Sequence, residues 1–290
     1  MLKKTALIGA VILAATISTG CSFTPTYYEQ NSFAKNATNM GGSLSIKDRP
    51  APEGGVNNFT QTVGFERLYI ASGFAQGLVT GGLNLLNVAI DDGPRESRSS
   101  VFGWMPLSYA DSREDAHRQL VAHVKQAIVR TLEHSDVEYT EIKSRDTGFV
   151  GYYIHDESVG CPSTVEQQKW HTDNIYYINS IKNPDACFVR ATIHTPRIDP
   201  TPSAIVAKHT EKESYQLPVG NKSNFSTIQV ASPQKSDLKE NLLYTQISKN
   251  LPEWMYLYLA PKTVSLGQNG KIDFPYILNQ GEASFFVHPE

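Results

Sequence analysis

The amino-acid sequence predicts an α+β fold with a mainly antiparallel sheet and two or three amphipathic helices. Segments with strand character recur between residues 137 and 288, whereas only two segments space their apolar residues as a helix does. Near the carboxyl end, Gln268-Asn269-Gly270 and Asn279-Gln280-Gly281 are typical of hairpin turns. Strands and helices do not alternate, so repeated β-α-β units are not expected.

The chain begins as a secretory signal does. Met1-Leu2-Lys3-Lys4 is a short basic start, and residues 5–17 carry no charge. This apolar stretch is shorter than the roughly 20 residues that a membrane-spanning helix needs. A basic start followed by such a short apolar stretch predicts that residues 1–20 are a cleaved signal peptide.

Ser18-Thr19-Gly20 places small residues directly before Cys21, and this arrangement resembles the lipobox of bacterial lipoproteins. The resemblance covers residues 1–22 and departs from the family pattern at Ser18, where Leu is most frequent. It implies that Cys21 becomes the acylated first residue. Ser22, rather than Asp, after the cysteine implies anchoring in the outer membrane, facing the periplasm of a Gram-negative host. An ordinary cleaved signal with an incidental cysteine is the alternative.

Residues 21–62 have the composition of a flexible tether. They are rich in Asn, Thr, Ser, Gly and Pro, show no period of 2 or 3.6, and include a cluster of turn residues at 48–55. We therefore expect a lipidated, flexible tether over 21–62 and a single folded periplasmic domain over 63–290. An alternative remains open, in which part of the tether packs on the domain through Tyr27, Tyr28 and Phe33.

Residues 63–90 form a Gly-rich apolar segment in which only Glu66 and Arg67 are charged. Gly73, Gly77 and Gly81 are four residues apart, so on a helix they would form one face that another backbone could approach closely. Each glycine costs about 1 kcal/mol in a helix interior, which demands a packing reason. Three interpretations remain open: core packing, membrane association or self-association, and a loop.

The mixed body follows a polar connector at 95–100. Residues 111–135 predict a helix in which Asp111 and Glu114 form a capping box, and residues 236–250 predict a second helix that ends before Pro252. The expected strands are 137–143, 149–155, 187–195, 204–209, 225–230, 254–259, 274–278 and 284–288.

Composition and charge limit the classes of function. Hydrophobic residues make up 40% of the chain and charged residues 19%, which is typical of a chain with a packed core. Without Lys3 and Lys4, 24 basic residues face 29 acidic ones, so the formal charge changes from −3 to −5. Neither value indicates a partner made of nucleic acid.

The cysteines divide into one lipidation site and one pair. With Cys21 acylated, Cys161 and Cys187 remain, and two cysteines in an oxidising compartment predict one disulfide. A catalytic thiol at either position is the competing hypothesis.

Aromatic residues gather in and beside the loop that this disulfide would close. They could form a recognition surface for glycans or peptides, because Tyr and Trp combine contact area with a polar atom, or they could be ordinary sheet residues. The residues concerned are Tyr152, Tyr153, Trp170, Tyr176 and Tyr177.

Enzymatic signatures are weak. The chain has no phosphate-binding Gly-Lys-Ser/Thr loop, no Gly-x-Ser-x-Gly turn and no zinc-protease motif. His155-Asp156-Glu157 and His171-Thr172-Asp173 are the compact groups that could supply ligands or acid–base catalysis, and solvated loops are the competing interpretation.

These observations predict a non-enzymatic, lipid-anchored envelope protein that binds or assembles within an envelope complex. We expect it to contact the membrane through its lipid, to have a protein partner in the envelope, to be able to self-associate and to need no cofactor. A periplasmic hydrolase or metal-dependent enzyme built around His155 and His171 is the first alternative, and a glycan- or peptidoglycan-binding protein is the second.

Overall fold

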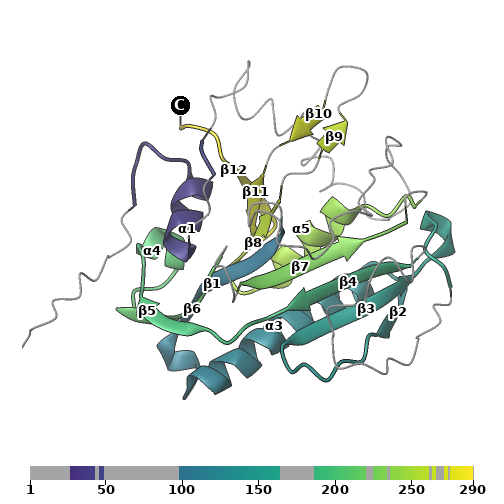
Figure 1. Cartoon of the computed structure of the whole chain (residues 1–290), viewed down its shortest axis with the longest axis horizontal. Helices are drawn as coiled ribbons and strands as arrows, with labels where there is room; N and C mark the ends of the chain where they lie inside the picture. Colours follow the sequence, from purple (N-terminus) through teal and green to yellow (C-terminus); the bar gives the residue numbers. More distant parts are fainter. Residues whose placement is uncertain are drawn as a thin grey trace, which may run out of the picture.

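The fold was analysed in a computed structural model (Figure 1). The residues that the structure describes are 27–42, 46–48, 98–163, 186–219, 225–233, 236–260, 263–265, 271–273 and 275–289. Within these ranges the chain combines α-helices with a mainly antiparallel sheet, which confirms the predicted α+β class. The predicted signal peptide, Cys21 and the Gly-rich segment 63–90 lie outside the described residues.

A ten-stranded sheet organises the described chain in the order β12-β11-β8-β1-β7-β4-β3-β2, with β6 pairing β1 and β5 pairing β6. Every strand pair in it is antiparallel. Its strands are β1 (Ser100–Pro106), β2 (Glu138–Glu141), β3 (Phe149–His155), β4 (Cys187–Thr192), β5 (Arg197–Pro200), β6 (Glu213–Leu217), β7 (Ser226–Ala231), β8 (Met255–Leu259), β11 (Tyr276–Asn279) and β12 (Glu282–Phe285). A separate hairpin joins β9 (Thr263–Ser265) to β10 (Lys271–Asp273).

Strand β1 lies at the centre and divides its pairing between neighbours. One edge pairs with β8, while the other pairs with β7 at Ser100 and Val101 and then with β6 from Gly103 onward. A Cβ atom at Gly103 would lie 2.4 Å from the carbonyl oxygen of Trp254, so only glycine permits this close approach. All of β1 is buried, as expected for a central strand.

Two helices cover one face of the sheet. α3 (Arg113–His134) packs against α5 (Glu240–Asn250), and their apolar faces form the larger core cluster together with inward residues of the strands. The sequence predicted both helices, but the capping box was wrong: Ser112, not Asp111, is the N-cap of α3 and accepts a hydrogen bond from the Asp115 amide.

The other face is partly covered by α1 (Phe33–Gly41) and α4 (Ala204–Ala207), which share a second core cluster with Phe102, Trp104 and Tyr256. α4 corrects the prediction of a strand at 204–209. Its N-cap residue Ser203 accepts from the Ile205 amide, and the Tyr256 hydroxyl donates to the carbonyl of Val206 over 2.5 Å. α1 corrects the expectation of a flexible tether for the described residues 27–42, which fold against the sheet. Tyr27 and Phe33 pack on the second core cluster, as the alternative expected, whereas Tyr28 is exposed.

Most of the other predicted strands are present in the structure, although their first and last residues differ from the predicted ones. β3 spans the predicted residues, and Asn279-Gln280-Gly281 turns the chain from β11 into β12 with positive φ angles at Gln280 (52°) and Gly281 (81°), as a type I′ hairpin requires. Strands β1, β5, β6, β9 and β10 were not predicted. Gln268-Asn269-Gly270 lies outside the described residues.

Candidate functional site

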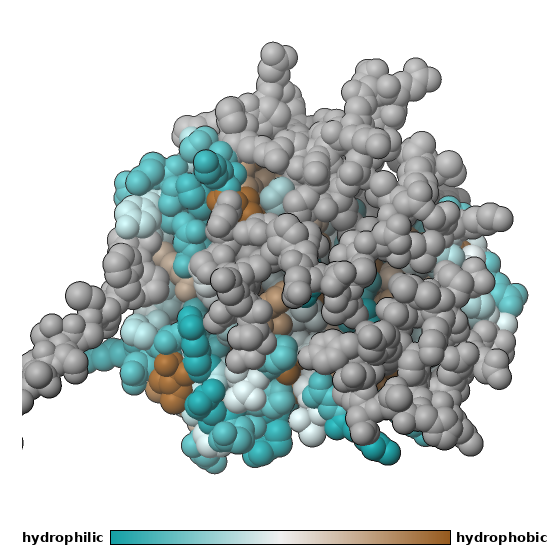
Figure 2. All heavy atoms as spheres, in the orientation of Figure 1, coloured by the Kyte–Doolittle hydropathy of each residue, from teal (hydrophilic) through white to brown (hydrophobic). Residues whose placement is uncertain are grey.

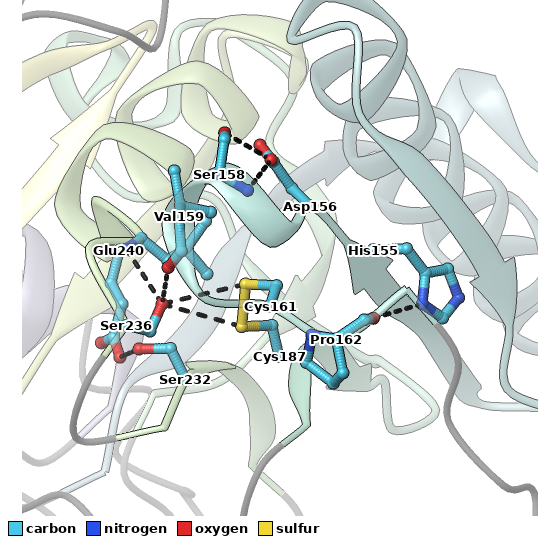
Figure 3. Close-up of a disulfide and its surroundings, with 11 residues drawn as sticks. His155, Asp156, Ser158, Val159, Cys161, Pro162, Cys187, Ser232, Ser236 and Glu240 are labelled. Atoms are coloured by element: carbon cyan, nitrogen blue, oxygen red, sulfur yellow. Dashed lines mark hydrogen bonds between the residues drawn. A yellow bond between two sulfur atoms is a disulfide. The ribbon is translucent and has the colours of Figure 1, made fainter.

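The predicted disulfide is formed between Cys161 and Cys187, with 5.4 Å between their Cα atoms. Both residues are fully buried in the larger core cluster. Cys187 begins β4, and Cys161 follows β3 through the short helix η4 (Glu157–Val159). The bond therefore fixes the point where the chain leaves β3 to the point where it returns in β4 (Figure 3).

Hydrogen bonds close the surroundings of the disulfide. The Ser236 hydroxyl lies 3.8 Å from each sulfur and donates to the carbonyl of Val159 over 2.7 Å. The Asp237 amide donates to the same carbonyl over 2.8 Å. In Figure 3, dashed lines join the Ser236 hydroxyl to both sulfurs and to the Val159 carbonyl. Because the sulfurs are buried and bonded to each other, the hypothesis of a catalytic thiol at Cys161 or Cys187 is wrong for this structure.

The polar residues beside the disulfide have structural roles. His155 donates from Nδ1 to the carbonyl of Pro162 over 3.0 Å, and its Nε2 forms a hydrogen bond of 2.9 Å with the Thr140 hydroxyl. The Asp156 carboxylate accepts from the amide and hydroxyl of Ser158 and caps η4 (Figure 3). His171 and Asp173, with which these residues were expected to converge, lie outside the described residues.

Tyr152 and Tyr153 do not form a common recognition surface. As neighbours on β3 they point to opposite faces of the sheet, and both are buried. Tyr152 packs edge-on against Tyr139 in the larger cluster, where burial raises the pKa of its phenol, and Tyr153 belongs to a small cluster with Phe188. This corrects the expectation for these two residues. Trp170, Tyr176 and Tyr177 lie outside the described residues.

A second candidate site lies where the described chain begins, and sequence reasoning assigned no function to it. The turn before α1 is fixed by Asn36, whose side-chain oxygen accepts from the Tyr28 amide over 3.0 Å and whose amide group donates to the Tyr28 carbonyl over 2.8 Å. Asn36 is only 1% exposed. These two hydrogen bonds attach Tyr28 to α1.

Asp48 secures the same end of α1. Its carboxylate accepts from the Ser32 amide over 2.7 Å and from the Ser32 hydroxyl over 2.5 Å, while the Ser32 hydroxyl also caps the helix by accepting from the Lys35 amide. A carboxylate at a helix N-terminus is favourable because the first amides carry partial positive charge. Residues 46–48 thus return to the start of α1.

The other end of α1 is fixed to the sheet by polar contacts. Gln216 on β6 donates to the carbonyl of Met40 over 2.9 Å, and Arg197 on β5 donates to the side-chain oxygen of Gln216 at 2.8 and 3.0 Å. The Val219 amide donates to the carbonyl of Gly41. Small residues on the inner face, Ala34 and Ala37, bring the helix close to the sheet.

We use the name N-terminal face for five side chains of the turn before α1, of the first turn of α1 and of α4 with its C-cap: Tyr28, Phe33, Lys35, Ile205 and Lys208. The Lys208 ammonium lies 5.9 Å from the centre of the Phe33 ring, so α4 and the start of α1 are direct neighbours. Tyr28 is 46% exposed and Ile205 is 59% exposed. In Figure 2, polar and apolar side chains are interspersed on the left of the view, where Figure 1 places α1, α4 and β5.

The described part of the chain contains no cluster of three or more His, Cys, Asp or Glu side chains arranged to hold a metal ion. Among the described helices, none combines the length and apolar character needed to cross a bilayer. Cys21, Gly73, Gly77 and Gly81 lie outside the described residues. Scans against protein-family models, curated proteins and solved structures found no match to the chain.

Proposed function

We propose that this protein is a lipid-anchored envelope protein that acts by binding, as an assembly component of an envelope complex in the periplasm, and does not itself catalyse a reaction. The observation that carries the proposal is the pairing of two features from different parts of the chain: a lipobox-like Cys21 and a buried disulfide in the folded body. Structural disulfides persist in oxidising compartments, which a chain with a cleaved signal reaches.

The position of the disulfide supports a structural role in such a compartment. It lies inside the larger core cluster, in contact with Ser236. A chain retained in a reducing cytosol would fold with two buried free thiols at this position. Export therefore explains why the cysteines are paired.

Metabolic labelling with palmitate tests the anchor. We expect label on the wild-type protein and none on Cys21→Ser, with the wild type in the membrane fraction. By the resemblance to bacterial lipoproteins, Ser22→Asp should move the lipidated protein from the outer to the inner membrane on a density gradient. Wild-type protein that carries no lipid would overturn the proposal.

Chemical cross-linking in the native envelope, followed by mass spectrometry, tests the binding role. We expect a reproducible protein partner cross-linked to the wild type, and the same partner at lower yield for the unlipidated Cys21→Ser variant. Cross-links to lipid and to other copies of the chain alone would contradict a role in an envelope complex. A peptidoglycan pull-down that captures the protein directly would favour glycan binding instead.

A further inference from the structure

We infer that the N-terminal face lies against the phospholipid headgroups of the membrane that holds Cys21. The inference rests on the proposed lipidation of Cys21 and goes beyond it, because it states which surface of the folded body contacts the bilayer. The partner is the headgroup layer of the lipid bilayer itself. Three observations support this orientation: the length of chain after Cys21, the exposed apolar side chains and the distribution of charge.

The chain between the lipid site and the folded body is short. Six residue steps separate Cys21 from Tyr27, and even a fully extended chain of six residues spans only about 20 Å. Asn36 then holds Tyr28 in place through hydrogen bonds of 3.0 and 2.8 Å. Tyr27 therefore stays within that distance of Cys21, and Asn36 joins the next residue, Tyr28, to α1.

The N-terminal face has the side chains of an interfacial contact. Four large apolar side chains are exposed in the described part of the chain, and two of them, Tyr28 and Ile205, belong to this face. Tyrosine is favoured at the headgroup level because its ring is apolar and its hydroxyl is polar. Ile205 stands on α4, whose neighbours Val206 and Ala207 are fully buried in the cluster that holds α1.

The charge at this face suits anionic headgroups. Lys35 lies in the first turn of α1, Lys208 stands over the Phe33 ring, and Lys47 is exposed beside the contact between Asp48 and Ser32. Of the nearby carboxylates, Asp48 is engaged at the N-cap, and Glu29 is exposed in the turn. Lysines at a membrane surface gain from the negative potential of anionic lipids even though the chain as a whole is acidic.

The opposite side of the sheet supplies a matched control. Tyr109, in the short helix η3 (Leu107–Tyr109), is 53% exposed and packs edge-on against Trp254, with ring centres 6.4 Å apart. Trp254 belongs to the core beneath α3 and α5. Tyr28 and Tyr109 are therefore the same residue type at similar exposure on opposite faces of the sheet.

Quenching by brominated lipid tests the orientation. The full-length lipidated protein is reconstituted in vesicles of phosphatidylethanolamine and phosphatidylglycerol with brominated acyl chains, and the tryptophan fluorescence of Tyr28→Trp, Ile205→Trp and Tyr109→Trp is compared with that of the wild type. We expect the fluorescence added by Tyr28→Trp and Ile205→Trp to be lost, and that added by Tyr109→Trp to persist.

Equal quenching of the three variants, or stronger quenching of Tyr109→Trp, would overturn the inferred orientation. The intact mass of the same preparations separates this result from failure of the proposed function: a protein without acyl chains contradicts the lipid anchor, whereas an acylated protein without selective quenching contradicts only the orientation. If a photo-reactive residue at position 28 captures a protein instead of lipid in native membranes, the face binds that protein and the inference is wrong.

Discussion

Two regions of the same sheet are held by different means. Beside β3 and β4, Cys161 and Cys187 form a covalent bond within the larger core cluster. Beside β1 and β6, α1 is held by buried alanines, an N-cap and the hydrogen bond from Gln216 to Met40. In the view of Figure 1 the two regions lie on opposite sides, with α1 on the left and β2 and β3 on the right.

The difference shows how the protein distributes its stability. A disulfide acts mainly on the unfolded chain by restricting its freedom, whereas α1 depends on many small contacts in the folded state. The attachment of α1 matters for function in our proposal, because its start sets the distance between body and membrane.

Removing the disulfide should have the largest effect. We expect the double variant Cys161→Ala/Cys187→Ala to lose about 3–4 kcal/mol of unfolding free energy, as the chain-entropy relation gives for a closed loop of this length; the separation is 26 residues. Urea denaturation measures this loss. Reduced wild-type protein is the control, and it should unfold at a urea concentration similar to that of the double variant. Unchanged stability on reduction would contradict a structural role.

Overfilling the contact between α1 and the sheet should come next. Ala37 is fully buried, so Ala37→Leu should cost about 1–3 kcal/mol by overpacking and loosen α1. Hydrogen exchange should then accelerate in residues 33–41 and stay unchanged at the disulfide. Asn39→Leu, at an exposed position of the same helix, is the matched control and should leave exchange slow.

Loss of the N-cap should have a smaller effect on the same helix. Ser32→Ala removes both the hydroxyl that accepts from the Lys35 amide and its bond to Asp48, and we expect a cost of about 1 kcal/mol. Asp48→Asn keeps the cap and should cost less. Thermal unfolding compares the melting temperatures of the two variants. If Asp48→Asn lowers the melting temperature more than Ser32→Ala does, the Asp48 carboxylate and not the Ser32 hydroxyl holds this end of α1.

The smallest expected effect is a pH dependence of the unfolding free energy that comes from His123 on α3. Burial beside Trp254 lowers the pKa of His123 below its usual 6.5, so the unfolded chain takes up the proton more readily. The contribution of neutral His123 to stability is therefore complete above pH 6.5 and declines as the pH falls toward the folded-state pKa.

His123→Phe tests this dependence. The variant should remove part of the stability loss seen when urea denaturation is repeated at successively lower pH below 6.5. His134→Phe, at an exposed position near the end of the same helix, is the matched control and should retain the wild-type pH dependence. Identical slopes for the wild type and His123→Phe would show that another group carries the effect.

The parts of the fold that sequence predicted are those specified by local pattern. Apolar spacing predicted α3 and α5, the extended pattern of residues 149–155 predicted β3, and Asn279-Gln280-Gly281 predicted the hairpin between β11 and β12. The disulfide followed from cysteine number once Cys21 was set aside. In each case the signal lies within one segment or in residue type.

The parts that sequence missed depend on distant partners. α1 has small and polar residues, and its burial comes from contact with Phe102 and Val219, far along the chain. Residues 204–207 have the composition of a strand, but the Ser203 cap and the bond from Tyr256 to Val206 hold them as a helix. The N-terminal face was missed because α1 and α4 meet only in the folded protein.

The mass of the amino-terminal peptide of the mature protein, isolated from membranes, tests the central claim most directly. We predict that this peptide begins at Cys21 and carries acyl chains, so that Tyr27, the first residue that the structure describes, lies six residues after the lipid site. An amino-terminal peptide that retains residues 1–20, or one with an unmodified Cys21, would contradict the lipid anchor and the membrane orientation derived from it.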